Sequence, residues 1–205
     1  MEKTLNFSEP FLNVDCISNE EDYEIQHKSI IINLDLDPLE ISDQELPTLH
    51  SMMFANTSVA RVRNMLHITI AKDRFIGKNP DVDEEIIKNT WNHVSQLFNA
   101  PQLKRTTLWR SQKERVRNFE LNLWYAPAGT HCGIHKQHEF LEVHTQVYGV
   151  GRMQKFHRND LRSLYQDVIM SPGYTHEPFY SSAGKYPWHQ YYAESDCIWL
   201  ALEKW

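Results

Sequence analysis

From residue 106 onward, short runs of alternating polar and apolar residues limit the fold more than any other feature of this sequence. Phe119, Leu121, Leu123 and Tyr125 fall on one face of an expected strand, because side chains alternate with a period of two in a strand. Many short strands separated by turns predict a barrel or sandwich. The turn signals that separate these runs are the Gly- and Pro-containing segments 127–129, 149–151, 171–173 and 183–184.

The strand expected over residues 141–148 has the most informative pattern. Glu142, His144, Gln146 and Tyr148 share one face. This polar face either meets solvent or lines the interior of a barrel. The opposite face is apolar enough to pack against another element. A cavity lined by the polar face is therefore expected.

The first 105 residues have a mixed pattern. A strand is expected over 29–36 and a second over 66–70, with a helix over 59–70 as the alternative reading of the second segment. Ser42 and Glu45 form a capping-box pattern that predicts a short helix.

The strongest helix prediction covers residues 81–99, which carry acidic residues in the first turn and end before Pro101. Its apolar side, with Ile87, Trp91 and Phe98, is expected to pack on the outside of the barrel. The predicted organisation is mainly β: an N-terminal α+β extension over 1–105, packed on a barrel over 106–205.

Composition excludes several classes of partner. The 205 residues include 21 basic and 27 acidic residues, a net charge of −6, which gives no electrostatic reason to bind nucleic acid or an anionic membrane. No apolar run reaches the roughly 18 residues of a membrane span, and the first residues lack the apolar core of a signal peptide. Three scattered cysteines fit reduced thiols. The sequence predicts a cytoplasmic protein with a small-molecule substrate, and a homodimer is compatible with it.

Histidine is the unusual residue, because seven of the 11 lie between residues 131 and 189. His135, His138 and Glu142 fall within eight residues, and His176 follows a Pro-Gly turn. Imidazole and carboxylate ligands suit Fe(II), Mn, Co, Ni or Zn. A site for a divalent metal ion with an open position for substrate is therefore expected.

At these residues the sequence resembles the cupin superfamily. The first cupin motif, G-x5-H-x-H-x3/4-E-x6-G, is matched from Gly129 to Gly149, except that two residues instead of one separate His135 from His138. The second motif, G-x5-P-x-G-x2-H-x3-N, is matched at Gly173 and His176. The first Gly and the final Asn of that motif are replaced. The resemblance covers about residues 118–203.

The resemblance implies a double-stranded β-helix, or jelly-roll barrel, with a divalent metal in its mouth. The implied ligands are His138, Glu142 and His176. His135 either joins them through a bulged loop or leaves two histidines and one carboxylate, the arrangement typical of O₂-using iron sites.

Other polar residues of the same region have candidate roles around the metal. His144, one pleat deeper than Glu142, is expected to contact substrate, with a general base or a replacement ligand as alternatives. Tyr148 is a second candidate for proton transfer. Gln146 and His189 are the candidate substrate-binding residues; stacking in the core or at the surface is the alternative for His189.

Three function classes follow. The favoured one is a metal-dependent enzyme acting on a small organic molecule, an Fe(II)-type dioxygenase. The alternatives are a non-redox isomerase, epimerase or lyase of the same fold, and a non-enzymatic module that binds a metal or small ligand. The fold cannot choose among these chemistries.

Overall fold

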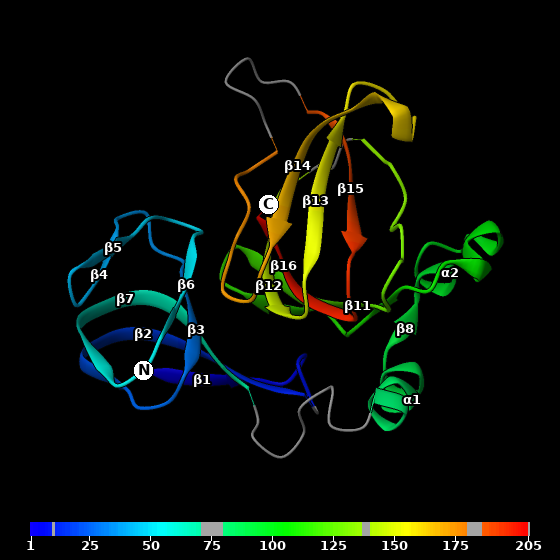
Figure 1. The fold of residues 1–205 in the computed structure, drawn as a ribbon. Coiled ribbons are helices and arrows are strands. Elements are labelled where there is room, and N and C mark those ends of the chain that lie inside the picture. The colour runs from blue at the N-terminus through cyan, green and yellow to red at the C-terminus, as the bar shows by residue number, and fades with distance from the viewer. Residues whose placement is uncertain (10, 71–79, 137–139, 180–185, 205) are drawn as a thin grey trace.

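The computed structural model describes residues 1–9, 11–70, 80–136, 140–179 and 186–204 (Figure 1). Strands dominate the described chain, as expected from its alternating pattern. The helices α1, α2 and the short 3₁₀ helices η1 and η2 connect or flank the sheets. Among the described residues, no helix is both long and apolar enough to span a membrane.

The N-terminal part is a five-stranded antiparallel sheet with the order β1-β2-β7-β3-β6. Its longest pair, β2 with β7, runs from Leu12 opposite Ile70 to Ile25 opposite Thr57. The segment 59–70 is therefore strand, and the helix alternative is wrong. The strands of this sheet are β1 (Glu2–Leu5), β2 (Leu12–Ile25), β3 (Ser29–Asn33), β6 (Ser51–Phe54) and β7 (Thr57–Ile70).

The short helix expected from the capping-box pattern at residues 42–45 is a β-hairpin instead. It pairs β4 (Leu39–Ile41) with β5 (Gln44–Leu46). Ser42 adopts a positive φ of 55° in the turn. The apolar side chains of Leu39, Ile41 and Leu46 are buried against one face of the N-terminal sheet, and burial of this apolar surface outweighs the local capping signal.

The helix expected over 81–99 is divided in two. Helix α1 (Pro80–Thr90) ends where β8 (Asn92–His93) begins, and α2 (Val94–Leu97) follows. Pairing of β8 with β9 (Trp109–Arg110) interrupts the helix. Ile87 and Trp91 are buried as expected, but Phe98 is 59% exposed and does not pack in the core.

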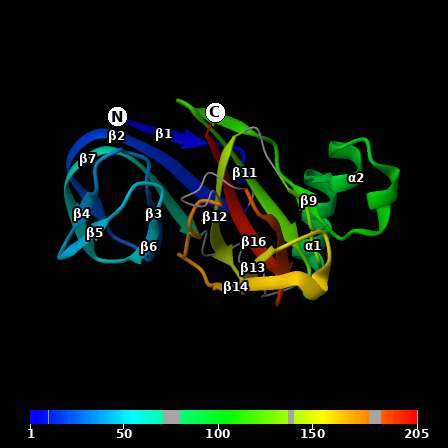
Figure 2. The ribbon, with the colours of Figure 1, turned by 90° about the horizontal axis from the view of Figure 1, so that it is seen from above.

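Two antiparallel sheets form the C-terminal part (Figures 1 and 2). The larger has the order β12-β16-β11-β9-β8, with β10 paired to β11, and the smaller has the order β14-β13-β15. Strand β8 belongs to the larger sheet although it precedes residue 106. The remaining elements are η1 (Pro101–Arg105), β10 (Glu114–Val116), β11 (Phe119–Ala126), β12 (Leu141–Tyr148), β13 (Gly151–Phe156), η2 (Leu161–Ser163), β14 (Leu164–Met170), β15 (Trp188–Ala193) and β16 (Cys197–Lys204).

The larger sheet is buried on both faces. Its outer face shares one hydrophobic core with the N-terminal sheet and α1, in which Leu200 packs with Ile30 and Ile87. Its inner face packs against the smaller sheet through residues such as Trp199, Met153 and Tyr191. Burial on both faces fits the near-continuous apolar sequence of β16, and it leaves the inner face of β12 pointing into the sandwich.

Candidate small-molecule site

The inner face of β12 carries two of the predicted functional residues. Glu142 lies opposite Glu203 and His144 opposite Ala201 on β16. The side chain of Ala201 is small, so the inner face has space beside His144. Glu142 and His144 are 7% and 8% exposed. The sequence pattern therefore placed both residues on the correct face of the strand.

A cavity of about 410 Å³ opens beside these residues. Its wall combines the inner face of the sandwich, the segment 132–135, and the segment that contains α2 and η1. Four of the predicted site residues line the cavity: His135, Glu142, His144 and His189. The described lining also includes the aromatic residues Trp124, Tyr191 and Trp199.

His144 is the central polar side chain of the cavity. Its Nε2 lies 3.2 Å from Oε1 of Glu142. Within the described part of the chain, neither ring nitrogen has a hydrogen-bond partner of acceptable geometry. A buried polar group without a partner costs about 1–3 kcal/mol. Such a group is stabilised when a ligand or water bonds to it.

His176 makes its bonds to the backbone. Its Nε2 accepts a hydrogen bond of 2.9 Å from the main-chain N–H of His144, and its Nδ1 lies 2.7 Å from the carbonyl oxygen of Glu177. Burial, and secondarily the nearby His144, lower the pKa of His176 to about 3. A neutral imidazole with both nitrogens engaged in this way has no free lone pair for a metal ion.

An apolar ring lies among the histidines. Phe179 is 2% exposed, and its ring centroid lies 4.5 Å from that of His176 and 4.0 Å from that of His189. The ring of His189 also contacts His135, with centroids 4.2 Å apart. His189 therefore lines the cavity as part of a cluster of mutually tilted rings. No pattern in the sequence indicated that Phe179 would lie in this position.

The described residues do not assemble the metal site expected from the resemblance. They contain no group of three or more His, Cys, Asp or Glu side chains that could hold a metal ion. The nitrogens of His176 are engaged by the backbone, and Nδ1 of His135 lies 3.0 Å from the carbonyl oxygen of Gly133. The fourth predicted ligand, His138, lies outside the described residues. The described residues alone therefore do not supply the ligands of a divalent cation, and the predicted set that includes His138 stays a prediction.

Gln146 has a structural position instead of the predicted place in the cavity. Its Oε1 accepts a hydrogen bond from the Tyr191 hydroxyl, and its Nε2 donates to the carbonyl oxygens of Tyr148 and Gly149 at 2.6 and 3.3 Å. The side chain is fully buried and does not line the cavity. These bonds engage both ends of the amide.

Tyr148 points away from the predicted site because β12 contains an irregularity. The register with β16 shifts between Gln146 and Tyr148, so that Tyr148 lies opposite Ile198. Ile198 belongs to the core on the outer face, and Tyr148 packs against that same core. One extra residue moves the following side chain to the other face of a sheet. Tyr148 therefore does not belong to the described lining of the cavity, and its catalytic role stays a prediction.

Hydroxyl groups connect the segment that carries His176 to the N-terminal sheet. Thr175 Oγ1 lies 2.6 Å from Oγ of Ser51 and 2.6 Å from Oγ1 of Thr145. Ser51 also donates to the carbonyl oxygen of Gly173 at 2.9 Å. The N-terminal sheet thereby helps to position His176, a role that no local sequence signal indicated.

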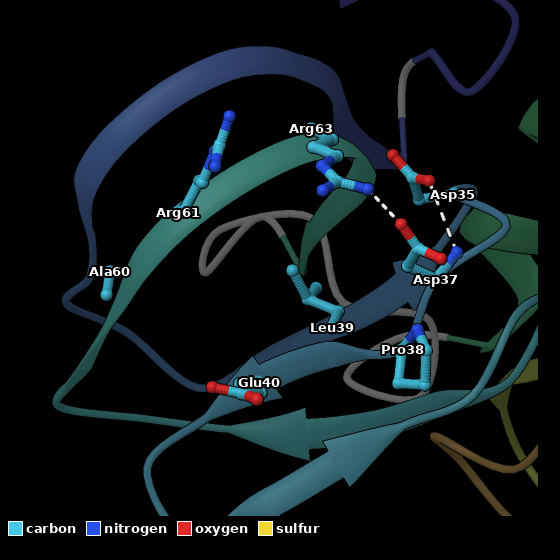
Figure 3. A pocket seen from close by; sticks show the side chains of 8 residues that line it. All are labelled: Asp35, Asp37, Pro38, Leu39, Glu40, Ala60, Arg61 and Arg63. Carbon is cyan, nitrogen blue, oxygen red and sulfur yellow. Dashed lines mark hydrogen bonds and ion pairs between the residues drawn. The ribbon is translucent and has the colours of Figure 1, made fainter.

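A second pocket, of about 250 Å³, lies on the N-terminal sheet (Figure 3). Figure 3 shows Arg63 turned towards Asp37, with which it forms an ion pair, and Arg61 pointing away from the aspartates. Arg61, Arg63, Asp37 and Glu40 are exposed. Exposed ion pairs contribute little to binding or stability, and the pocket has no counterpart of the buried His144. We place the candidate site in the larger cavity.

No protein-family model and no curated protein matches the sequence. Several solved structures are similar in part. The similarity to ectoine synthase from P. lautus has 14% identity and a TM-score of 0.38; it covers 49% of this chain and 66% of the synthase, just under two thirds. KdgF from Halomonas sp. has 10% identity and a TM-score of 0.38, covering 56% of this chain and 87% of KdgF.

A sugar phosphate isomerase of the cupin superfamily from Silicibacter pomeroyi has 19% identity and a TM-score of 0.34, over 47% of this chain and 59% of the isomerase. In the chain itself, the two facing antiparallel sheets and the partial motifs on and beside β12 agree with the resemblance found in the sequence. The described residues of the C-terminal part form a sandwich of two antiparallel sheets, the architecture that this resemblance predicts.

Proposed function

We propose that the chain is a small-molecule enzyme in which His144 transfers a proton within the apolar cavity. One observation carries the proposal: His144 is buried in the cavity wall with both ring nitrogens lacking hydrogen-bond partners in the described structure, and its Nε2 lies 3.2 Å from Glu142. A carboxylate at this distance can stabilise the imidazolium that forms when His144 takes up a proton.

The pair supplies the two parts of a proton transfer. The His144 ring takes a proton from the substrate, and the carboxylate of Glu142 stabilises the imidazolium that forms. The apolar wall strengthens the attraction between the carboxylate and the imidazolium, and the cavity opens to solvent, so that the imidazolium can exchange its proton with water before the proton returns to the substrate. A proton removed beside a carbonyl group and returned to a neighbouring atom gives an isomerisation, and its return to the opposite face of the same carbon gives an epimerisation. Neither reaction needs a further reactant.

The Fe(II)-type dioxygenase expected from the sequence remains a separate prediction. Its ligand set includes His138, outside the described residues, and His176, whose nitrogens are bonded to the backbone. Metal analysis of the purified protein, with O₂ uptake measured on the same sample, tests it. A stoichiometric metal that disappears in Glu142→Ala and His138→Ala would support the dioxygenase.

Deuterium exchange tests the proton transfer directly. The purified protein is incubated in D₂O with a panel of uncharged aryl ketones such as 1-phenylpropan-2-one, and deuterium incorporation beside the carbonyl is followed by NMR. The wild type should accelerate exchange. His144→Gln should lose about 100-fold or more of that acceleration, the usual contribution of a general base. Glu142→Gln should lose less, because the base itself remains.

Two controls keep this test specific. Melting curves must show that His144→Gln is folded at the assay temperature. The variant His157→Gln alters an exposed histidine and should exchange at the wild-type rate. The proposal is rejected when the wild type does not exceed the buffer rate for any ketone of the panel, or when His144→Gln matches the wild type.

A further inference from the structure

The described lining of the cavity is mainly apolar and carries a small set of polar side chains. Glu142 and His144 lie 3.2 Å apart, and His135 and His189 also line the cavity. The apolar wall is built from Val94, Phe98, Leu103, Leu108, Trp124 and Trp199. A ligand that fills about 410 Å³ and leaves no apolar surface unpaired must itself be mainly apolar.

Much of this wall comes from outside the strands of the sandwich. The segment 94–108 leaves and rejoins the larger sheet at neighbouring points. The Val94 N–H donates a hydrogen bond of 2.9 Å to the carbonyl oxygen of Leu108, and β8 pairs with β9. His93 Nε2 lies 2.7 Å from the carbonyl oxygen of Thr106 and also ties the segment together. Compact loops of this kind are often functional.

Phe98 stands at the rim of the cavity. It follows α2 and is 59% exposed although it is a large apolar residue. The core does not hold Phe98, so its exposed ring is available to a bound molecule. Val94, 4% exposed, and Leu103 continue the same wall inwards.

The described lining of the cavity carries acidic charge. Glu142 is the acidic residue of the described lining, and that lining contains no lysine or arginine. Arg110, on the inner face nearby, stacks 5.5 Å over the ring of Trp124 and faces the charges of Glu203 and Glu120. Lys155, paired across the sheet with His189, faces Glu177.

Cys132 adds no negative charge of its own at neutral pH, because burial raises the pKa of its thiol. A buried anion needs a countercharge or several donors. The described lining offers an anionic ligand neither a lysine nor an arginine, and Glu142 repels it.

We infer that the cavity binds uncharged or cationic molecules with an aromatic or branched apolar body, and that it rejects carboxylates and phosphate esters. The apolar body lies along the wall formed by Phe98, Leu103 and Trp199. The hydroxyl or amino group of the ligand meets His144 and Glu142. This inference rests on the cavity assigned under the proposed function, and it adds the class of ligand.

Three matched probes test the charge rule. 2-Phenylethanol, 2-phenylethylamine and phenylacetate share a phenyl body and differ in the charge of the polar end. Their dissociation constants for the full chain are measured at pH 7 by ligand-observed NMR titration. The alcohol and the amine should bind about tenfold or more tightly than the carboxylate, a ratio typical of one unfavourable charge contact. Glu142→Gln should remove the advantage of the amine over the alcohol.

A second pair of variants tests the wall. Phe98→Ser should weaken the alcohol and the amine several-fold by removing apolar contact. The control is Leu161→Ser, which alters a 53% exposed residue of η2 that is not part of the cavity lining. The control should bind both probes as the wild type does.

The outcomes separate this inference from the proposed function. Phenylacetate binding as tightly as the alcohol, or no binding of any probe, overturns the ligand class, and so does equal weakening by Phe98→Ser and Leu161→Ser. Binding in the expected order without any deuterium exchange leaves the ligand class intact and rejects proton transfer, because the titration does not require turnover.

Discussion

The main-chain N–H of His144 donates a hydrogen bond of 2.9 Å to Nε2 of His176 and so connects β12 to the segment 171–179. The two histidines therefore have different roles. The side chain of His144 faces the cavity, whereas the ring of His176 is held between two backbone groups. A motif comparison treats both as members of one ligand set, and the hydrogen bonds separate them.

The first prediction concerns the stability role of His176. Replacing it by Ala leaves the His144 N–H without its acceptor and opens a cavity beside Phe179, so the free energy of unfolding should fall by about 2–4 kcal/mol. Urea denaturation measures this. His157→Ala, at an exposed position, should change the value by less than about 0.5 kcal/mol. Equal effects of the two substitutions would contradict the assignment.

The second prediction is the pH dependence that follows from the same residue. The folded-state pKa of His176, about 3, is below the unfolded value of about 6.5. Between these values the unfolded chain binds more protons, so stability is full above pH 6.5 and declines as the pH falls towards 3.

This contribution can be isolated by a variant that does not titrate. His176→Gln should lose less stability between pH 7 and pH 4 than the wild type, which loses up to about 1.4 kcal/mol per pH unit from this group. Unfolding free energies measured across that range give the difference. Parallel curves for the two proteins would show that His176 is not buried in its neutral form.

Particular residues show how far the sequence could predict the structure. The alternation through Leu121 and Leu123 predicted β11, and the same reasoning placed Glu142 and His144 on the inner face, because a period of two is a local property of a strand. The period failed at Tyr148, where the register with β16 shifts. Such a shift depends on pairing with the partner strand, so the alternation of polar and apolar residues within β12 does not predict it.

Non-local contacts explain the other differences. No Gly or Pro interrupts residues 81–99, so nothing local predicted that pairing of His93 with Trp109 would divide the helix. The same pairing brings Val94 and Phe98 to the cavity. Phe179 is close to His176 in the sequence but also contacts His144 and His189, which come from other strands. The motif spacing alone could not reveal that this ring lies among the three histidines.

The third prediction uses the close approach of Gly151 to Tyr191. A Cβ built on Gly151 would overlap the Tyr191 hydroxyl and ring, and this ring stacks on Trp199 with centroids 3.9 Å apart. Gly151→Ala should therefore destabilise the fold by about 1–3 kcal/mol. Urea denaturation measures the loss. An unchanged free energy of unfolding would show that the Tyr191 ring and its hydrogen bond to Gln146 can move without an energetic cost.

The last prediction compares two lysines that differ in burial. Lys113 lies 3.1 Å from Glu120 and also pairs with Glu203, whose side chain is 4% exposed. Lys3 pairs with Glu114 at 3.3 Å, with 60% of the lysine side chain exposed. Without Lys113 the buried Glu203 loses its ion-pair partner, although Asn122 Nδ2 still donates a hydrogen bond of 3.0 Å to it, whereas an exposed pair contributes little. Lys113→Met should lower the free energy of unfolding at pH 7 by about 3 kcal/mol, and Lys3→Met by less than about 1 kcal/mol.

Urea denaturation of both variants provides the measurement. Similar losses of stability in the two variants would mean that solvent or another donor compensates the charge of Glu203. The carboxylates on the inner face of the larger sheet would then be less isolated from water than their burial indicates.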